Sequence, residues 1–226
     1  MTDAAPKRQE SWWDTLRFLA LLFLGAVLLR SLVASPFSIP SGSMVPTLLI
    51  GDYLFVAKWP YGYSRFSFPW GLASFDGRIW GALPARGDVV VFRSPTGPDA
   101  LIKRVIGLPG DVVAVADGRV VLNGRPLARR RVADAAVPVT PNSPCRIVAD
   151  GGAREAEDNS ACLYPRWIET LPGGRSYPVL DQGDTPGDMM APVRVPAGHV
   201  LVMGDNRDDS LDGRFAPAVG GVGLLP

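Results

Sequence analysis

The longest apolar stretch of the chain lies near its N-terminus. Residues 18–29 are all apolar or glycine, and after Arg30 the stretch continues to Ala34. A helix over these residues would be about 25 Å long, close to the minimum that crosses the hydrocarbon core of a bilayer. The pattern therefore predicts a transmembrane helix over residues 16–35.

Basic residues are distributed unevenly around this stretch. Lys7, Arg8 and Arg17 precede it, whereas no basic residue occurs between Arg30 and Lys58. By the positive-inside rule, residues 1–15 would stay in the cytoplasm and the rest of the chain would be exported. A cleaved secretory signal is the alternative, but Pro36 would directly follow its cleavage point, so we favour a retained anchor.

After Pro36 the chain consists of short β-branched and apolar runs separated by Gly and Pro. Such runs predict strands at residues 52–58, 88–92, 101–106, 112–115, 120–122 and 200–203. Asn123-Gly124 is typical of a hairpin turn. No helical periodicity of comparable length follows the anchor, so the exported part is expected to be mainly β.

Two stretches depart from this rhythm. Residues 59–80 are crowded with aromatic side chains, which favour either a membrane interface or a hydrophobic cluster under a long loop. Residues 129–196 are polar and rich in Pro and Gly, and they predict an inserted, loop-heavy lobe.

Composition narrows the classes of partner and cofactor. The 226 residues carry a net charge of +1, which gives no indication of a nucleic-acid partner. Two cysteines and one histidine make a structural zinc site improbable, and no cofactor is expected. In an oxidising compartment Cys145 and Cys162 could form a disulfide, contributing roughly 3 kcal/mol, or they could remain unpaired thiols.

The candidate chemistry starts from a serine that lacks the usual base. Ser43 lies in a loop between Pro40 and Pro46, where Gly42 permits a close backbone approach. A hydroxyl needs a base to become a nucleophile, and the single histidine, His199, has no acidic neighbour before Asp205. A Ser-His-Asp triad is therefore disfavoured.

Lysine can replace histidine as the base if burial lowers its pKa. Strand alternation places Leu101, Lys103 and Val105 on one face and Ile102, Arg104 and Ile106 on the other. Arginine stays charged in proteins, so Lys103 is the member of the Lys-Arg pair that can act as a neutral amine. A surface lysine on an edge strand is the alternative.

A polar turn at residues 204–214 forms the third constellation. Asp208, Ser210 and Asp212 mimic the start of a calcium loop, but Val219 stands where a bidentate Glu is required. We expect instead a turn in which Asp and Ser side chains bond to Arg207 and Arg214, and which could orient a catalytic lysine.

Together, in this order, four blocks resemble bacterial type I signal peptidase, a membrane-anchored Ser/Lys endopeptidase family. They are IPSGSMVPTL at residues 39–48, RGDVVVF at 86–92, IKRVIGLPGD at 102–111 and GDNRDDSLDGR at 204–214. The resemblance implies that Ser43 is the nucleophile and Lys103 the general base. It also implies an oxyanion hole formed by the Ser43 backbone N–H and the Ser41 hydroxyl. Ser210 would hydrogen-bond the lysine and orient it, while Asp212 and Arg214 would form a supporting ion pair.

The resemblance further implies substrate and fold. Pockets for small residues at the first and third positions before the cut would be lined by Phe37, Ile39, Pro40, Met44, Leu48, Leu101 and Ile102. An antiparallel β core over residues 36–111 and 196–226 would carry a β-rich insertion at 112–195. Gly213 stands where the family commonly has serine, and the family usually continues through another strand-bearing segment beyond residue 226.

The primary hypothesis is thus a signal peptidase I in the cytoplasmic membrane. Its catalytic domain would lie on the outer side, cleave signal peptides from exported preproteins through an acyl-enzyme, and contact the lipid bilayer but no nucleic acid or metal. The alternative is a tethered β domain that binds extended peptides without cleaving them, because a C-terminal segment is missing. A self-cleaving Ser/Lys peptidase of the repressor type is disfavoured by the membrane anchor.

Overall fold

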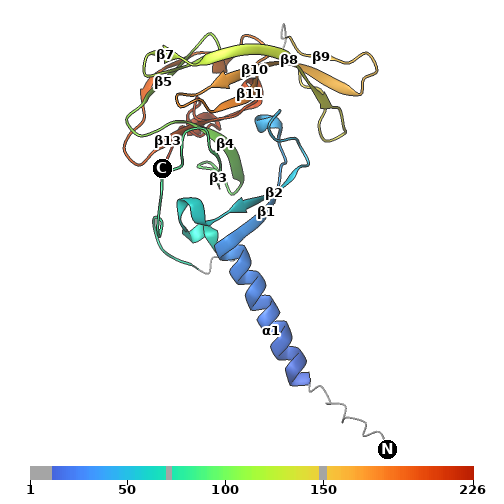
Figure 1. The fold of residues 1–226 in the computed structure, drawn as a ribbon, viewed down its shortest axis with the longest axis vertical. Helices are drawn as coiled ribbons and strands as arrows, with labels where there is room; N and C mark the ends of the chain where they lie inside the picture. Colours follow the sequence, from blue (N-terminus) through green and yellow to red (C-terminus); the bar gives the residue numbers. More distant parts are fainter. Residues whose placement is uncertain (1–11, 70–72, 148–151) are drawn as a thin grey trace, which may run out of the picture. The chain divides into compact units, whose positions relative to one another are not determined.

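The computed structural model describes residues 12–69, 73–147 and 152–226 (Figure 1). The chain divides into two compact units. The first contains the described residues up to Phe37 together with Phe55–Ala82, and the second contains Ser38–Leu54 and Leu83–Pro226. Each unit is described by itself below.

An apolar helix begins the first unit. Helix α1 spans Trp12–Leu28 and continues as a π-helical turn over Leu29–Val33. The 22 residues of Trp12–Val33 have a mean hydropathy of 2.1, long and apolar enough to cross a membrane. This confirms an N-terminal apolar helix, which begins four residues before the predicted start at 16. Lys7 and Arg8, on which the predicted orientation partly rests, lie outside the described residues.

The aromatic segment of the first unit follows a two-stranded sheet of β1 (Ala34–Ser38) and β2 (Tyr53–Ala57). Two short 3₁₀ turns, Trp59–Tyr61 and Arg65–Ser67, take the place of longer elements there. Trp59, Phe66 and Trp80 are each more than half exposed, so these three do not form the buried cluster considered above. Contact of this segment with a membrane interface stays a prediction, and Trp70 lies outside the described residues.

Three four-stranded sheets form the second unit, and their pairings are antiparallel. The first has the order β14-β13-β4-β3, from Leu224–Leu225, Val200–Met203, Ala100–Gly107 and Val89–Arg93. The second has the order β12-β5-β6-β7, from Met190–Arg194, Val112–Ala116, Arg119–Leu122 and Arg125–Pro126. The third has the order β11-β10-β8, from Ser176–Leu180, Ala161–Thr170 and Ala128–Pro138, and β9 (Arg154–Glu155) also pairs with β10. The mainly β, antiparallel fold is confirmed, and all six predicted strands are present.

The expectation of a loop-heavy lobe at residues 129–196 is wrong. Strands β8 and β10 are 11 and 10 residues long and pair along most of their length. Most side chains of β8 are exposed or half-buried, so its sequence shows little of the apolar alternation that identifies a strand. Backbone pairing with β10 provides the order that the side-chain pattern does not reveal.

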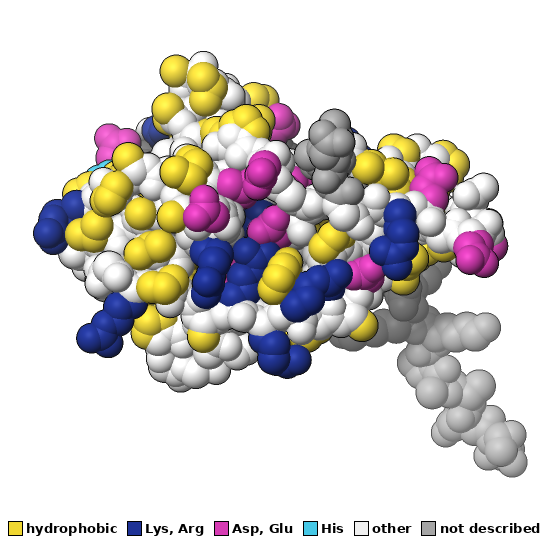
Figure 2. Space-filling view, turned by 90° about the horizontal axis from the view of Figure 1, so that it is seen from above, with side chains coloured by type: hydrophobic (Ala, Val, Ile, Leu, Met, Phe, Trp, Pro, Cys, Tyr) yellow, Lys and Arg dark blue, Asp and Glu magenta, His cyan; other side chains and the backbone are white. Residues whose placement is uncertain are grey.

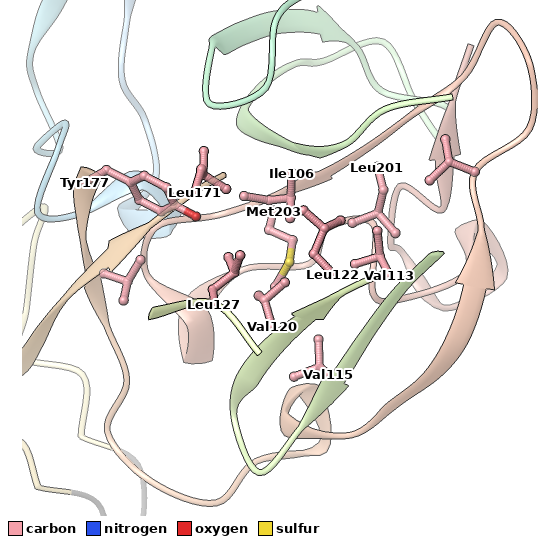
Figure 3. Close-up of a cluster of buried hydrophobic side chains, with 12 residues drawn as sticks. Ile106, Val113, Val115, Val120, Leu122, Leu127, Leu171, Tyr177, Leu201 and Met203 are labelled. Carbon is pink, nitrogen blue, oxygen red and sulfur yellow. The ribbon is translucent and has the colours of Figure 1, made fainter. Parts of the chain in front are cut away.

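A hydrophobic cluster joins the predicted core and the predicted insertion (Figure 3). Ile106, Leu201 and Met203 come from the first sheet, whereas Val120 and Leu122 come from the second. Shared apolar burial of this kind makes the two parts one compact unit. The domain boundaries predicted within it stay predictions.

Cys145 and Cys162 form a disulfide, with their Cα atoms 5.3 Å apart. The bond ties the loop after β8 to strand β10, and Cys162 is buried beside Val137 and Tyr164. Of the two alternatives left open by the sequence, the structure therefore contains the paired one.

Charged side chains of both signs are interspersed on the face shown in Figure 2. Ion pairs also connect neighbouring strands: Asp134 of β8 pairs with Arg131 of the same strand and with Arg154 of β9. Pairing of this kind fits the net charge of only +1.

Candidate active site

Ser43 lies in a single 3₁₀ turn, Gly42–Met44. Pro40 and Pro46 prevent a longer helix on either side, and the Val45 N–H closes the turn by donating to the Gly42 carbonyl at 3.1 Å. A Cβ atom on Gly42 would lie only 3.0 Å from Asp209 Oδ2, so the close approach expected at this glycine is present. The turn leaves Ser43 only 6% exposed.

Strand β4 brings Lys103 to this serine. Lys103 Nζ and Ser43 Oγ are hydrogen-bonded at 2.6 Å, and Lys103 is 3% exposed. Burial lowers the pKa of Lys103, and this effect outweighs the carboxylates of Asp212 and Asp209, which raise it. A lysine in this setting can lose its proton at a lower pH than an exposed lysine and can then accept one from the serine.

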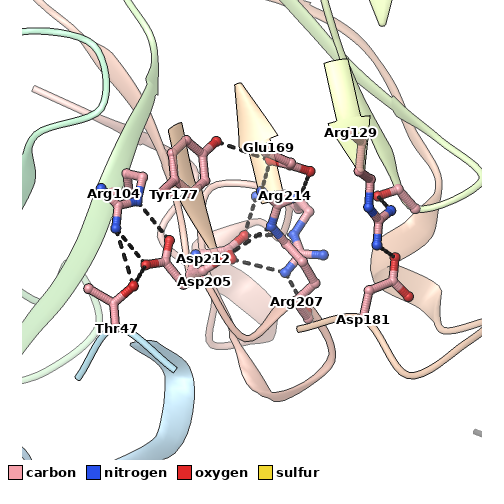
Figure 4. Close-up of polar contacts among 12 residues, drawn as sticks. Thr47, Arg104, Arg129, Glu169, Tyr177, Asp181, Asp205, Arg207, Asp212 and Arg214 are labelled. Carbon is pink, nitrogen blue, oxygen red and sulfur yellow. Dashed lines mark hydrogen bonds and ion pairs between the residues drawn. The ribbon is translucent and has the colours of Figure 1, made fainter. Parts of the chain in front are cut away.

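Arg104 is buried as well, which strand alternation alone did not predict. It forms a bidentate pair with Asp205, with Nε to Oδ1 at 2.8 Å and Nη2 to Oδ2 at 2.6 Å (Figure 4). Its guanidinium also lies 4.3 Å from the centre of the Tyr177 ring and donates to the Gly87 carbonyl. The strand therefore carries two buried basic side chains, of which Arg104 is paired with Asp205 and Lys103 contacts the serine.

The turn at 204–214 is organised around Asp212, which is completely buried. Its carboxylate accepts hydrogen bonds from Arg214 Nε at 2.9 Å, from Ser210 Oγ at 2.8 Å and from the Gly204 N–H at 2.8 Å. Burial by itself would raise the pKa of Asp212, but the charge and hydrogen bonds of Arg214 and the Gly204 N–H hold it below its ordinary value. Asp212 and Arg214 thus form the ion pair expected from the sequence.

Two side chains of this turn differ from the expectation. The hydroxyl of Ser210 donates to Asp212, and in the described part of the chain it makes no hydrogen bond to Lys103. Arg207 pairs with Glu169 of β10 and not with an acid of the turn. Long-range pairing could not be read from the turn's sequence, because Glu169 lies 38 residues away.

The two groups predicted for an oxyanion hole are close together in the chain. Ser41 precedes the 3₁₀ turn and has an exposed side chain. Within the described residues the Ser43 N–H donates to no protein acceptor. His199, considered as an alternative base, has its ring Nδ1 bonded to the Ala197 carbonyl, whereas the partner of Ser43 is Lys103.

The residues predicted to line substrate pockets differ in burial. Leu48, Leu101 and Ile102 are half-buried and Pro40 is exposed, whereas Ile39 is 4% and Met44 0% exposed. Met44 is therefore fully enclosed by protein and does not line an open substrate pocket. Phe37 is half-buried and belongs to β1 in the first unit.

Strand β4 extends beyond the end of its neighbour β13 next to Lys103. The register of β4 with β3 covers Ala100 to Arg104, but its register with β13 runs only from Arg104 to Gly107. The β13 side of residues 100–103 thus lies outside that pairing, beside the serine turn.

Asp205, Thr47 and Asn206 contribute to the site but were not singled out as site residues from the sequence. Thr47 Oγ1 donates to Asp205 Oδ2 at 2.5 Å, and Asn206 contacts the Ser43 turn directly. Asp205 and Asn206 lie in the fourth motif block, residues 204–214, and their place in this block was the only indication in the sequence that they belong to the site. Their partners, which lie 101 to 164 residues away, could not be identified from it.

Three carboxylates elsewhere in the second unit could hold a metal ion. Asp181, Asp188 and Asp208 have ligand atoms within 4.8 Å of one another. Protein donors already contact each of them: Arg129 on Asp181, Thr185 on Asp188 and the Gln182 N–H on Asp208. Burial raises the pKa of Asp208, and the neighbouring carboxylates add to that effect.

A buried serine and lysine in hydrogen-bond contact on an antiparallel β scaffold define a candidate Ser/Lys hydrolase. A family model described as signal peptidase, peptidase S26, matches residues 12–226. The chain belongs to this family of peptidases.

Named relatives agree with this assignment. Signal peptidase I of Rickettsia akari (strain Hartford) is 35% identical over 217 residues, which cover 91% of this chain and 72% of the relative. The Rickettsia canadensis (strain McKiel) protein of that name is 34% identical over 213 residues, with 89% and 71% covered. That of Rickettsia prowazekii (strain Madrid E) is 35% identical over 201 residues, with 84% and 67% covered.

Proposed function

We propose that this protein is a signal peptidase I that cleaves signal peptides with a Ser43/Lys103 dyad. Lys103 Nζ takes the proton of Ser43 Oγ, and the oxygen attacks the scissile carbonyl carbon to give a tetrahedral intermediate. Collapse of the intermediate breaks the C–N bond, and the amine leaves with a proton returned by Lys103. Water, deprotonated by the same amine, then hydrolyses the ester and frees the signal peptide. The 2.6 Å contact of Ser43 with the buried amine is the observation that carries this proposal.

Charge stabilisation in this proposal comes from the serine turn. The Ser43 N–H, which donates to no acceptor in the described part of the protein, and the Ser41 hydroxyl would bind the oxyanion. Asp212 and Arg214 support the lysine side of the site, and Ser210 acts through its bond to Asp212.

The proposed substrate is an extended peptide with small residues at the first and third positions before the cut. Residues 100–103 of β4 extend past the end of β13, so their backbone on that side can pair with such a peptide. The half-buried Leu101, Ile102 and Leu48 provide apolar surroundings for small side chains. The apolar helix would anchor the enzyme in the cytoplasmic membrane with its N-terminus in the cytoplasm, so that it acts on exported preproteins at the outer face.

Cleavage of a preprotein in detergent micelles tests the proposal. Ser43→Ala and Lys103→Ala should each reduce cleavage to background, because each removes one half of the acyl-transfer machinery. Lys58→Ala is the matched control and should cleave like the wild type, because Lys58 Nζ bonds to the Ser67 carbonyl in the first unit. Wild-type cleavage by either dyad variant would refute the mechanism.

A peptide-binding domain without hydrolysis is the second candidate, since the pairing edge of β4 would serve it equally. An assay of the wild-type protein with a preprotein distinguishes the peptidase from the peptide-binding domain. Conversion of the preprotein to two fragments supports the peptidase, whereas binding of intact preprotein without fragments supports the binder.

A further inference from the structure

Asn206 holds the two peptide groups on either side of the Ser43 α-carbon. Its backbone N–H donates to the Ser43 carbonyl at 3.1 Å, and its side-chain Nδ2 donates to the Gly42 carbonyl at 3.2 Å. A carbonyl oxygen only accepts, so the amide must present its nitrogen to Gly42. The residue is 5% exposed, and Gly204 and Asp205 separate it from the end of β13 at Met203.

The contact with the Gly42 carbonyl also sets the direction of the Ser43 N–H. The Gly42 C=O and the Ser43 N–H belong to the same planar trans peptide group and point in opposite directions. A donor that holds the oxygen on one side therefore sets the direction of the N–H on the other. Val45 N–H donates to the same oxygen, but it belongs to the turn itself, whereas Asn206 approaches from a segment 164 residues away.

The other half of the amide has no partner among the described residues. Asn206 Oδ1 is buried and accepts no hydrogen bond from the described residues. Asn206 lines a small cavity together with Gly42, Arg146, Tyr164 and Asp209. Leaving a buried acceptor unpaired is unfavourable, so packing alone gives no reason for an amide at this position. The hydrogen bond from Nδ2 to the Gly42 carbonyl accounts for it.

We propose that Asn206 is a positioning residue that aims the Ser43 N–H at the oxyanion formed during peptide cleavage. This inference rests on the proposed function and adds the element that orients its oxyanion donor. Asn206 touches no reacting atom and acts through the Gly42–Ser43 peptide group. Its contribution should appear in the transition state and not in the binding of the ground-state substrate.

Asn206→Ala provides the test in the full-length protein in detergent. Loss of the side-chain donor should reduce kcat about 10- to 100-fold and leave KM within about twofold. Deleting an oxyanion donor itself typically reduces kcat about 100- to 1,000-fold, so the expected loss is equal or smaller. A peptide aldehyde, which forms a tetrahedral adduct with the serine, should bind weaker by a similar factor. The released signal peptide should bind with unchanged affinity, and the pH at which activity rises should not move. Leu211→Ala, an exposed residue of the same turn, is the control and should match the wild type.

The outcomes separate this inference from the proposed function. If Asn206→Ala cleaves like the wild type, or loses aldehyde and product binding equally, Asn206 does not position the donor. Full activity of Ser43→Ala or Lys103→Ala in the same assay would instead refute the dyad. If the alanine variant fails to fold, Asn206→Leu, which keeps a side chain of similar size without a donor or a charge, carries the same expectations.

Discussion

Lys103 Nζ and Ser43 Oγ are 2.6 Å apart although the residues are separated by 60 positions in the chain. Strand β4 supplies the amine and a proline-flanked turn supplies the hydroxyl. Both groups are buried, so the fold removes water from a lysine that has a carboxylate network nearby. The chemistry of the site depends on how these opposing effects set the pKa of that amine.

The pH dependence of cleavage should report the protonation of Lys103. Because burial lowers its pKa, kcat/KM should rise with pH through a midpoint below the ordinary value of 10.5 for lysine. Asp209 is among the carboxylates that raise this pKa, so Asp209→Asn should move the rise to lower pH. Asp208→Asn is the matched control, since Asp208 contacts Gln182 and Thr185, and its midpoint should stay at the wild-type value. An unchanged midpoint in Asp209→Asn would argue against Lys103 as the titrating base.

Stability should increase when the catalytic amine is removed. A lysine whose folded-state pKa lies below its unfolded-state value binds its proton more weakly in the folded protein, so protonation opposes folding. This cost is fully present below the folded-state pKa and disappears as the pH rises toward 10.5. Lys103→Met should therefore raise the thermal unfolding midpoint at neutral pH, abolish cleavage, and lose its stability advantage at high pH. A variant less stable than the wild type at pH 7 would contradict the destabilising role of the buried amine.

The Arg104–Asp205 pair should be much more important for stability than the exposed pairs of β8. Asp205→Asn would leave the Arg104 guanidinium buried without its counter-ion, which we expect to cost about 3–5 kcal/mol in free energy of unfolding. Asp134→Asn removes a carboxylate whose partners Arg131 and Arg154 are 42% and 61% exposed, and should cost about 0–1 kcal/mol. Urea unfolding of both variants in detergent measures the difference. Equal costs would mean that burial does not govern these pairs.

Local sequence patterns were sufficient for the strands that carry the site. The alternation around Lys103 and the two prolines around Ser43 are properties of a few consecutive residues, and the structure has a strand and a short turn there. Asn123 and Gly124 both adopt positive φ, as the hairpin interpretation of this dipeptide requires.

Contacts between distant segments were not accessible in the same way. Arg207 pairs with Glu169, and Arg104 with Asp205, through approaches that only the assembled sheets produce. Strand β8 was missed because its arginines interrupt the apolar alternation that indicates a strand. Backbone pairing with β10 orders it instead. The position of Ser210 shows the same limit: resemblance indicated a bond to Lys103, whereas its hydroxyl donates to Asp212.

Trapping of a covalent intermediate would show whether Ser43 is the nucleophile. Full-length protein is mixed with a preprotein in detergent, quenched with acid during turnover, digested, and analysed by mass spectrometry. We expect a signal-peptide acyl group on Ser43 in the wild type, and no such adduct in Ser43→Ala or Lys103→Met. Cleavage without any adduct on Ser43, or an adduct on a different residue, would contradict this expectation.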